Sequence, residues 1–84
     1  MYTDQEGYEQ AEARLREALA LFQGMGCRWE EGRTLVDLAR LYRRRGDEGD
    51  RERAWQHYQE ALSRFEELWA RPDIERVQQE MLGL

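Results

Sequence analysis

The chain has 84 residues, a net charge of −5 at pH 7 and no lysine, so all thirteen of its cations are arginines. An acidic chain of this size forms one small domain and has no general affinity for phosphate backbones or anionic membranes, so we expect neither nucleic acid nor membrane as a partner. Cys27 is the only cysteine, which excludes an internal disulfide, and no apolar run reaches transmembrane length, so the sequence predicts a cytoplasmic protein.

The first predicted helix covers residues 4–23. Its apolar residues recur at steps of three and four and therefore share one helical stripe: Tyr8, Ala11, Leu15, Ala18, Leu19 and Phe22. Thr3 and Glu6 have the spacing of an N-terminal capping box. Gly24 and Gly26 are expected to end the helix, because glycine accepts the left-handed conformation found at helix C-termini.

The second predicted helix covers residues 28–45 and has a wider apolar arc. Its main stripe, and then the two residues that widen it on opposite sides, are Leu35, Leu38, Ala39 and Tyr42, with Val36 and Leu41. A helix that is apolar over such an arc packs against neighbours on two sides.

The third predicted helix covers residues 51–70, with Asp50 as its N-cap. Its inward residues are Ala54, Tyr58, Ala61, Leu62, Phe65 and Leu68. The fourth covers residues 72–82, where Pro72 suits the first turn and Ile74, Val77 and Met81 form the apolar side. No segment has the alternating pattern of a strand, so the fold class is all-α, with four helices in antiparallel hairpins within a single domain of residues 1–84.

An internal repeat appears when the chain is shifted by 43 residues. The identical pairs are Glu9 and Glu52, Ala11 and Ala54, Glu17 and Glu60, Ala18 and Ala61, Leu19 and Leu62, Phe22 and Phe65, Arg28 and Arg71, and Arg33 and Arg76. Repeats of this length are typical of stacked helical hairpins.

The repeat also carries a family resemblance. The segment Leu35-x-x-Leu38-Ala39-x-x-Tyr42 resembles the helix A pattern W-x-x-L-G-x-x-Y of the tetratricopeptide repeats with two substitutions. The helix B pattern of spaced small and aromatic residues is similar in two stretches, Ala54, Tyr58, Ala61 and Ala11, Leu15, Ala18. The chain thus resembles a long, about 40-residue variant of this family, like the C-terminal repeats of bacterial multidomain regulators. The resemblance implies helices in the order B-A-B-A of a tetratricopeptide solenoid.

This order leaves the first helix without its A partner and the last without its B partner. Because fewer than three repeats are rarely stable alone, we expect either compaction into a bundle or pairing with a second copy as a homodimer. Trp55, Leu62 and Trp69, spaced by seven, form a ridge along the third helix. We favour a core position for this ridge, and the alternative is an interface with a second chain, where tryptophan is enriched.

The resemblance implies a binding groove lined by the A helices. The exposed residues that match this face are Arg33, Asp37, Arg40, Arg44, Arg76 and Glu80. Several arginines on one face can grip the carboxylates of an extended acidic peptide through paired hydrogen bonds. The alternative, which we favour at this point, is a solvated face on which Arg33 and Asp37 form a weak surface pair.

Catalysis is not expected. His57 is the only histidine, so one chain cannot assemble a histidine-rich metal site or a catalytic triad, and no metal or cofactor is predicted. The tripeptide Arg45-Gly46-Asp47 lies where the tetratricopeptide family places its turn between helices, so we interpret it as a turn and not as a receptor-binding motif. The sequence predicts a non-catalytic protein–protein interaction or assembly module, the C-terminal part of a longer repeat array. The alternative is a purely structural capping domain that associates only with itself.

Overall fold

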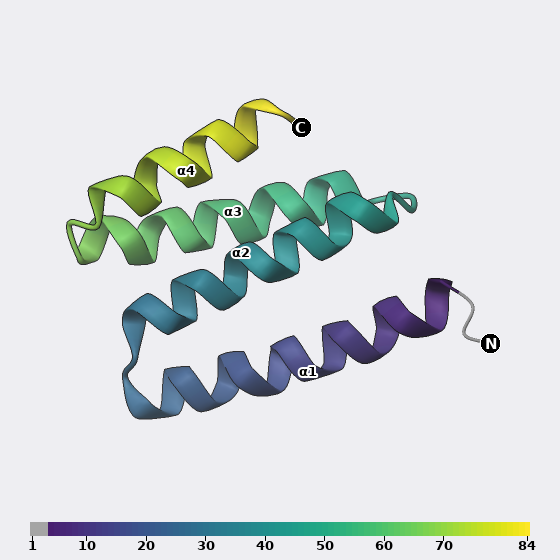
Figure 1. Ribbon diagram of the computed structural model, residues 1–84, viewed down its shortest axis with the longest axis horizontal. Helices are drawn as coiled ribbons and strands as arrows, with labels where there is room; N and C mark the ends of the chain where they lie inside the picture. Colours follow the sequence, from purple (N-terminus) through teal and green to yellow (C-terminus); the bar gives the residue numbers. More distant parts are fainter. Residues whose placement is uncertain (1–3) are drawn as a thin grey trace.

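Four helices connected by short joints make up the computed structural model, which describes the backbone of residues 4–84 and the side chains of residues 7–84 (Figure 1). The helices are α1 (Asp4–Met25), α2 (Arg28–Arg45), α3 (Asp50–Glu67) and α4 (Arg71–Leu82). The described residues contain no strand, which confirms the all-α prediction. The side chains of the predicted capping box, Thr3 and Glu6, lie outside the described residues.

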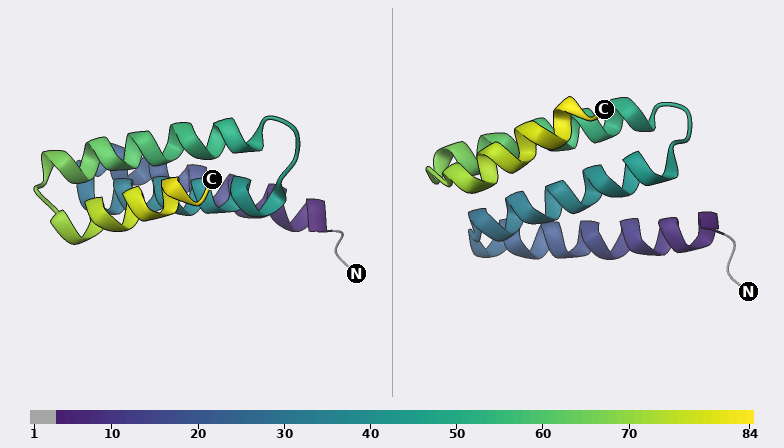
Figure 2. Two further views of the ribbon diagram at one scale, coloured as in Figure 1. Left: turned by 90° about the horizontal axis from the view of Figure 1, so that it is seen from above. Right: turned by 45° about the horizontal axis from the view of Figure 1, so that its top comes forward.

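Consecutive helices run antiparallel and pack against each other, with the closest association between α2 and α3. Figures 1 and 2 show α1 and α4 on opposite sides of the α2–α3 pair, with the α1–α2 and α3–α4 joints at the same end. The chain measures 42 × 30 × 18 Å along its principal axes, so the helices form a flat array. Within the part of the chain that the structure describes, no helix is long and apolar enough to cross a membrane.

The hydrophobic core lies along α2, which packs against α1 and α3. Its buried residues are Leu35, Val36, Leu38, Ala39, Leu41, Tyr42, Ala54, Tyr58, Ala61, Phe65 and Val77. All but five of these come from α2, as the wide apolar arc predicted. Each large side chain buried here stabilises the fold by about 1.5–3 kcal/mol relative to an exposed one.

Gly32 lets α2 and α3 approach closely. A Cβ atom at this position would lie 2.8 Å from the ring of Phe65, which is only 2% exposed. Any larger residue would therefore force the two helices apart or displace the ring.

The α1–α2 and α3–α4 joints have the same backbone hydrogen bonds. At the first joint, Cys27 N–H donates to the carbonyl of Phe22 at 2.9 Å, and at the second, Ala70 N–H donates to that of Phe65 at 3.0 Å. This is the Schellman pattern, in which the residue before the donor adopts a left-handed conformation. Gly26 does so with φ 71°, and so does Trp69 with φ 56°.

These joints correct two predicted boundaries. Gly24 lies inside α1, which continues to Met25 before Gly26 ends it. Helix α3 ends at Glu67 and does not reach residue 70, so Leu68, predicted to face inward, is exposed in the joint.

The α2–α3 joint is held by a buried ion pair. Arg45 donates to both carboxylate oxygens of Asp50 at 2.7 and 2.8 Å, and Asp50 also accepts from Arg53 at 2.9 Å. The predicted N-cap is wrong: Asp50 is the first residue of α3, and Gly49 precedes it with φ 83°. The hydrogen bonds from Arg45 hold the pKa of Asp50 far below its usual range. Because Arg45 is engaged in this way, Arg45-Gly46-Asp47 acts as a structural turn.

Candidate functional site

A pocket of about 180 Å³ lies between α2 and α4. Its lining residues are Trp29, Arg33, Val36, Asp37, Arg40, Phe65, Asp73, Arg76 and Val77. Four of the six residues predicted for the groove therefore line one pocket: Arg33, Asp37, Arg40 and Arg76. Their spacing on α2 places them on one side of that helix, and Arg76, the repeat counterpart of Arg33, extends the same surface on α4. We call this feature the α2–α4 pocket.

Trp29 ties the beginnings of α2 and α4 together. Its indole Nε1–H donates to Asp73 at 3.2 Å, and the guanidinium of Arg33 lies 5.5 Å from its ring centroid. A cation above an indole face is attracted by about 0.5–1 kcal/mol at a partly exposed site. Trp29 therefore forms a wall of the pocket and also orients one of its arginines.

Arg40, another lining residue of the pocket, is bound to Glu80 on α4. Arg40 donates to the two carboxylate oxygens of Glu80 at 2.9 and 2.6 Å, and the Tyr58 hydroxyl donates to the same carboxylate at 2.9 Å. The hydrogen bonds from Arg40 lower the pKa of Glu80 and so keep it ionised. Glu80 thus joins α2, α3 and α4, and the structure gives it a bracing position instead of an open place in the groove.

The remaining arginines of the pocket have no such partners. Neither Arg33 nor Arg76 has a carboxylate within 4.0 Å among the described residues. The predicted surface pair between Arg33 and Asp37 is wrong, because Asp37 lies 3.8 Å from Arg40 instead. Two guanidinium groups beside an indole can bind a carboxylate through paired hydrogen bonds.

Besides Glu80, a second residue predicted for the groove lies outside the pocket, and residues that were not predicted for the groove line it. Arg44 is exposed and does not line the pocket. Trp29 and Asp73 line it, although neither was predicted for the groove. The repeat held a signal for this contact, because it aligns Trp29 with Pro72, and aligned helix starts become neighbours when α2 and α4 stack side by side.

The three residues of the predicted tryptophan ridge differ in burial. Leu62 is half-buried and packs against the core, whereas Trp55 is exposed and Trp69 is 90% exposed. The core interpretation is therefore wrong for both tryptophans. Trp55 lines a shallow groove of about 750 Å³ between α3 and the end of α4, together with Met81, Leu82 and Leu84. Leu82 is 84% exposed there.

His57 lies away from both features, at the edge of the α2–α3 contact. Its Nδ1 is 2.7 Å from the carbonyl oxygen of Arg53, and its ring centroid is 5.2 Å from that of Tyr42.

Comparisons with known proteins do not place the chain in a family: no family model, curated protein or solved structure matches it. The tetratricopeptide relationship accordingly stays a prediction.

Proposed function

We propose that this chain is a non-catalytic protein-interaction module of tetratricopeptide type, which binds an acidic segment of an extended peptide in the α2–α4 pocket. One observation carries the proposal: Arg33 and Arg76 converge on one pocket beside Trp29 and have no carboxylate partner there. The guanidinium N–H groups of an arginine without a carboxylate partner, at a partly enclosed surface, can donate hydrogen bonds to a carboxylate of the ligand.

The other charges of the pocket support this assignment. Asp73 accepts the indole N–H of Trp29, and Asp37 and Glu80 both lie against Arg40. The acidic side chains are thus engaged within the protein, and an incoming carboxylate meets guanidinium groups. A pocket of about 180 Å³ suits one carboxylate side chain and not a cofactor. A cytoplasmic location belongs to the same proposal and is supported by the unpaired Cys27.

The experiment is a titration of the protein with fluorescent peptides that contain consecutive glutamates. We expect Arg33→Ala and Arg76→Ala each to weaken binding by about tenfold, which corresponds to the loss of one charge-assisted contact. Raising the salt concentration should weaken binding to the native protein further. Arg44→Ala removes the same charge outside the pocket and serves as the matched control. Equal affinities for all three variants would show that net charge, not the pocket, holds the peptide.

A second candidate function is self-association, favoured by the groove that Trp55 and Leu82 line. Exposed tryptophan and leucine in one groove are typical of contact surfaces between proteins. Sedimentation over a wide concentration range tests this candidate. A concentration-dependent dimer that Trp55→Ala dissociates is the expected result, and a monomer at all concentrations would rule it out.

A further inference from the structure

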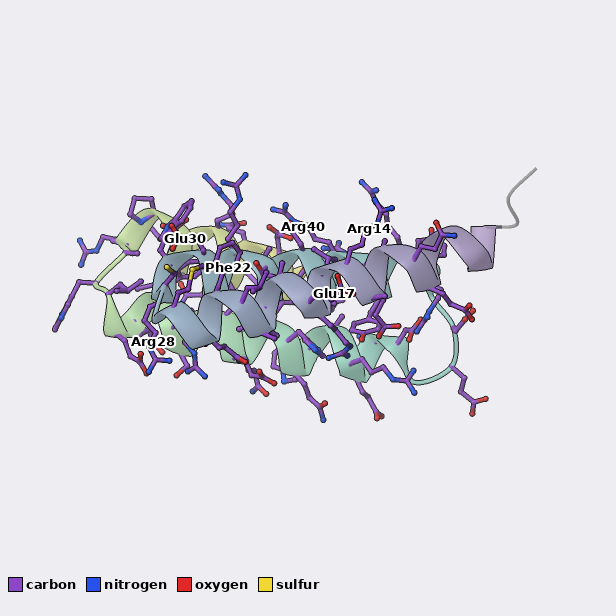
Figure 3. The ribbon with its side chains drawn as sticks, turned by 90° about the horizontal axis from the view of Figure 1, so that it is seen from below. Arg14, Glu17, Phe22, Arg28, Glu30 and Arg40 are labelled. Carbon is purple, nitrogen blue, oxygen red and sulfur yellow. The ribbon has the colours of Figure 1, made fainter. Side chains whose placement is uncertain are left out.

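Helix α1 carries a second apolar stripe that the described residues 4–84 cover only in part. Ala18, Leu21, Phe22 and Met25 follow each other at steps of three, one and three, so they share one side of the helix. Leu21 is 65% exposed and Met25 63% exposed. Figure 3 looks onto α1, with Phe22 labelled, and no helix lies in front of it. The other apolar side of α1 packs against the core through Tyr8, Ala11, Leu15 and Leu19.

The internal repeat shows what covers such a stripe. The repeat counterparts of Ala18 and Phe22 are Ala61 and Phe65 on α3, which are buried at 0% and 2% exposure because α2 lies over them. The cover depends on Gly32, whose missing side chain makes room for the Phe65 ring. Among the helices of residues 4–84, none lies on the same side of α1 in the place that α2 takes on α3.

Helix α4 of a second copy of this chain does not match that helix. It is the repeat counterpart of α2 and would occupy the place of α2 if two copies stacked in the register of the repeat. In α4, Glu75 stands where α2 has Gly32, and Gln78 stands where α2 has the buried Leu35. Glu75 would meet the Phe22 ring, and Gln78 would be buried without a defined hydrogen-bond partner.

The differences between α1 and α3 define the chemistry of the missing helix. On α3, Arg64 forms an ion pair with Glu31, which is buried in α2. On α1 the counterpart of Arg64 is Leu21. A carboxylate opposite Leu21 would be buried without a partner and would weaken binding, whereas an aliphatic residue would bury apolar surface on both sides.

We propose that the stripe of Ala18, Leu21, Phe22 and Met25 binds an antiparallel amphipathic helix of another protein, with a glycine opposite Phe22 and an aliphatic residue opposite Leu21. This surface is separate from the α2–α4 pocket, and the proposal does not rest on peptide binding there. The partner is thus a helix with the apolar pattern of α2, altered at the position of Glu31.

The test uses labelled peptides with the sequence of residues 28–45 and the intact protein. The peptide with Glu31→Leu should bind about tenfold more tightly than the unchanged peptide. The peptide with Gly32→Leu should not bind. In the protein, Leu21→Arg restores the arrangement of Arg64 and should reverse the preference, so that the unchanged peptide binds better than the Glu31→Leu peptide. Because Leu21 is exposed, the far-ultraviolet circular dichroism of this variant should equal that of the native protein.

A reversal of the preference between the two peptides distinguishes a defined helix-binding site from nonspecific hydrophobic binding. Equal affinity for the three peptides, or a Leu21→Arg protein that binds them in the same order as the native protein, overturns the proposal. A native protein that forms dimers, is dissociated by Leu21→Arg and binds none of the peptides also overturns it, because the stripe would then join two copies of this chain.

Discussion

The α1–α2 joint and the α3–α4 joint have the same backbone and different side chains. Both follow the Schellman pattern, yet the left-handed position is Gly26 in one and Trp69 in the other. A residue with a Cβ atom costs about 1–2 kcal/mol in that conformation, and Trp69 is 90% exposed, so no packing within the chain offsets the cost. The hydrogen-bonded turn is therefore set by the repeat and not by the residue at its left-handed position.

The helices that lead into these joints differ in the same way. Phe22 and Phe65 are identical residues at matched positions, but Phe65 is fully buried and Phe22 is only half-buried. Position in the array, and not residue identity, decides how much each contributes to stability.

The largest expected difference in stability between variants of the α1–α2 half and variants of the α3–α4 half concerns these phenylalanines. Phe65→Ala should lower the free energy of unfolding by about 3–5 kcal/mol, because it leaves a cavity under Gly32. Phe22→Ala should lower it by less than about 1.5 kcal/mol, because the ring is only half-buried. Urea unfolding followed by circular dichroism measures both values. Similar losses for the two variants would contradict the difference in burial.

The first residue of α3 and its repeat counterpart in the first turn of α1 give the next comparison. Asp50→Asn should destabilise the protein by about 3–5 kcal/mol, because Arg45 would lose its buried charge partner and keep only the exposed Asp47 at 3.5 Å. The repeat counterpart of Asp50 is Gly7, which is exposed, and Gly7→Ala should be neutral or slightly stabilising. Thermal unfolding of the two variants measures the contrast, and an Asp50→Asn protein as stable as the native one would show that the ion pair does not stabilise the joint.

Acid should weaken the protein through the same carboxylate. The pKa of Asp50 is lower in the folded than in the unfolded protein, so its stabilising effect is present above its unfolded pKa of about 3.9 and is lost as the pH falls below that value. The hydrogen bond from Tyr42 lowers the pKa of Glu12 and so adds in the same direction. The free energy of unfolding should therefore fall between pH 6 and pH 3, and by less in Asp50→Asn. An equal fall in both proteins would assign the acid sensitivity to other groups.

Close helix approach is expected to matter at one glycine and not at another. Gly32→Ala should destabilise by about 1–3 kcal/mol, because its Cβ would overlap the Phe65 ring. Gly24→Ala meets no atom within 4 Å and should stabilise α1 by up to about 1 kcal/mol. Melting temperatures of the two variants that shift in the same direction would contradict this assignment.

The smallest expected effects are at the two left-handed positions. Trp69→Gly should stabilise the protein by about 1 kcal/mol, and Gly26→Ala should destabilise it by a similar amount. Chemical unfolding at several temperatures resolves differences of this size. A destabilised Trp69→Gly protein would mean that the exposed indole contributes to the fold after all.

Local patterns predicted the helices well and their ends less well. The spacing of apolar residues gave four helices, and Pro72 falls in the first turn of α4 as expected. The end of α3 was missed because the sequence has no glycine there, and only the hydrogen bonds of the joint place Trp69 in a left-handed conformation. The conformational propensity of a residue type is an average, whereas the turn at Trp69 is imposed by the packing of α3 and α4.

The α2–α4 pocket was predictable in part. Helical spacing put Arg33, Arg40 and Arg76 on one surface, and the structure brings them together. The pairing of Asp37 with Arg40 and the contact of Trp29 with Asp73 depend on the angle between α2 and α4, which no local pattern contains. Side-chain partners across helices therefore needed the three-dimensional arrangement.

The matched joints have a practical consequence for engineering. The segment from Arg28 to Ala70 ends in the same hydrogen-bonded turn that precedes its first residue. It is thus a self-compatible building block, which can be concatenated in a synthetic gene so that each new α2 follows the turn at Trp69. Such a concatenated protein would lengthen the array by one hairpin per copy, and the Gly32–Phe65 contact would recur in every copy.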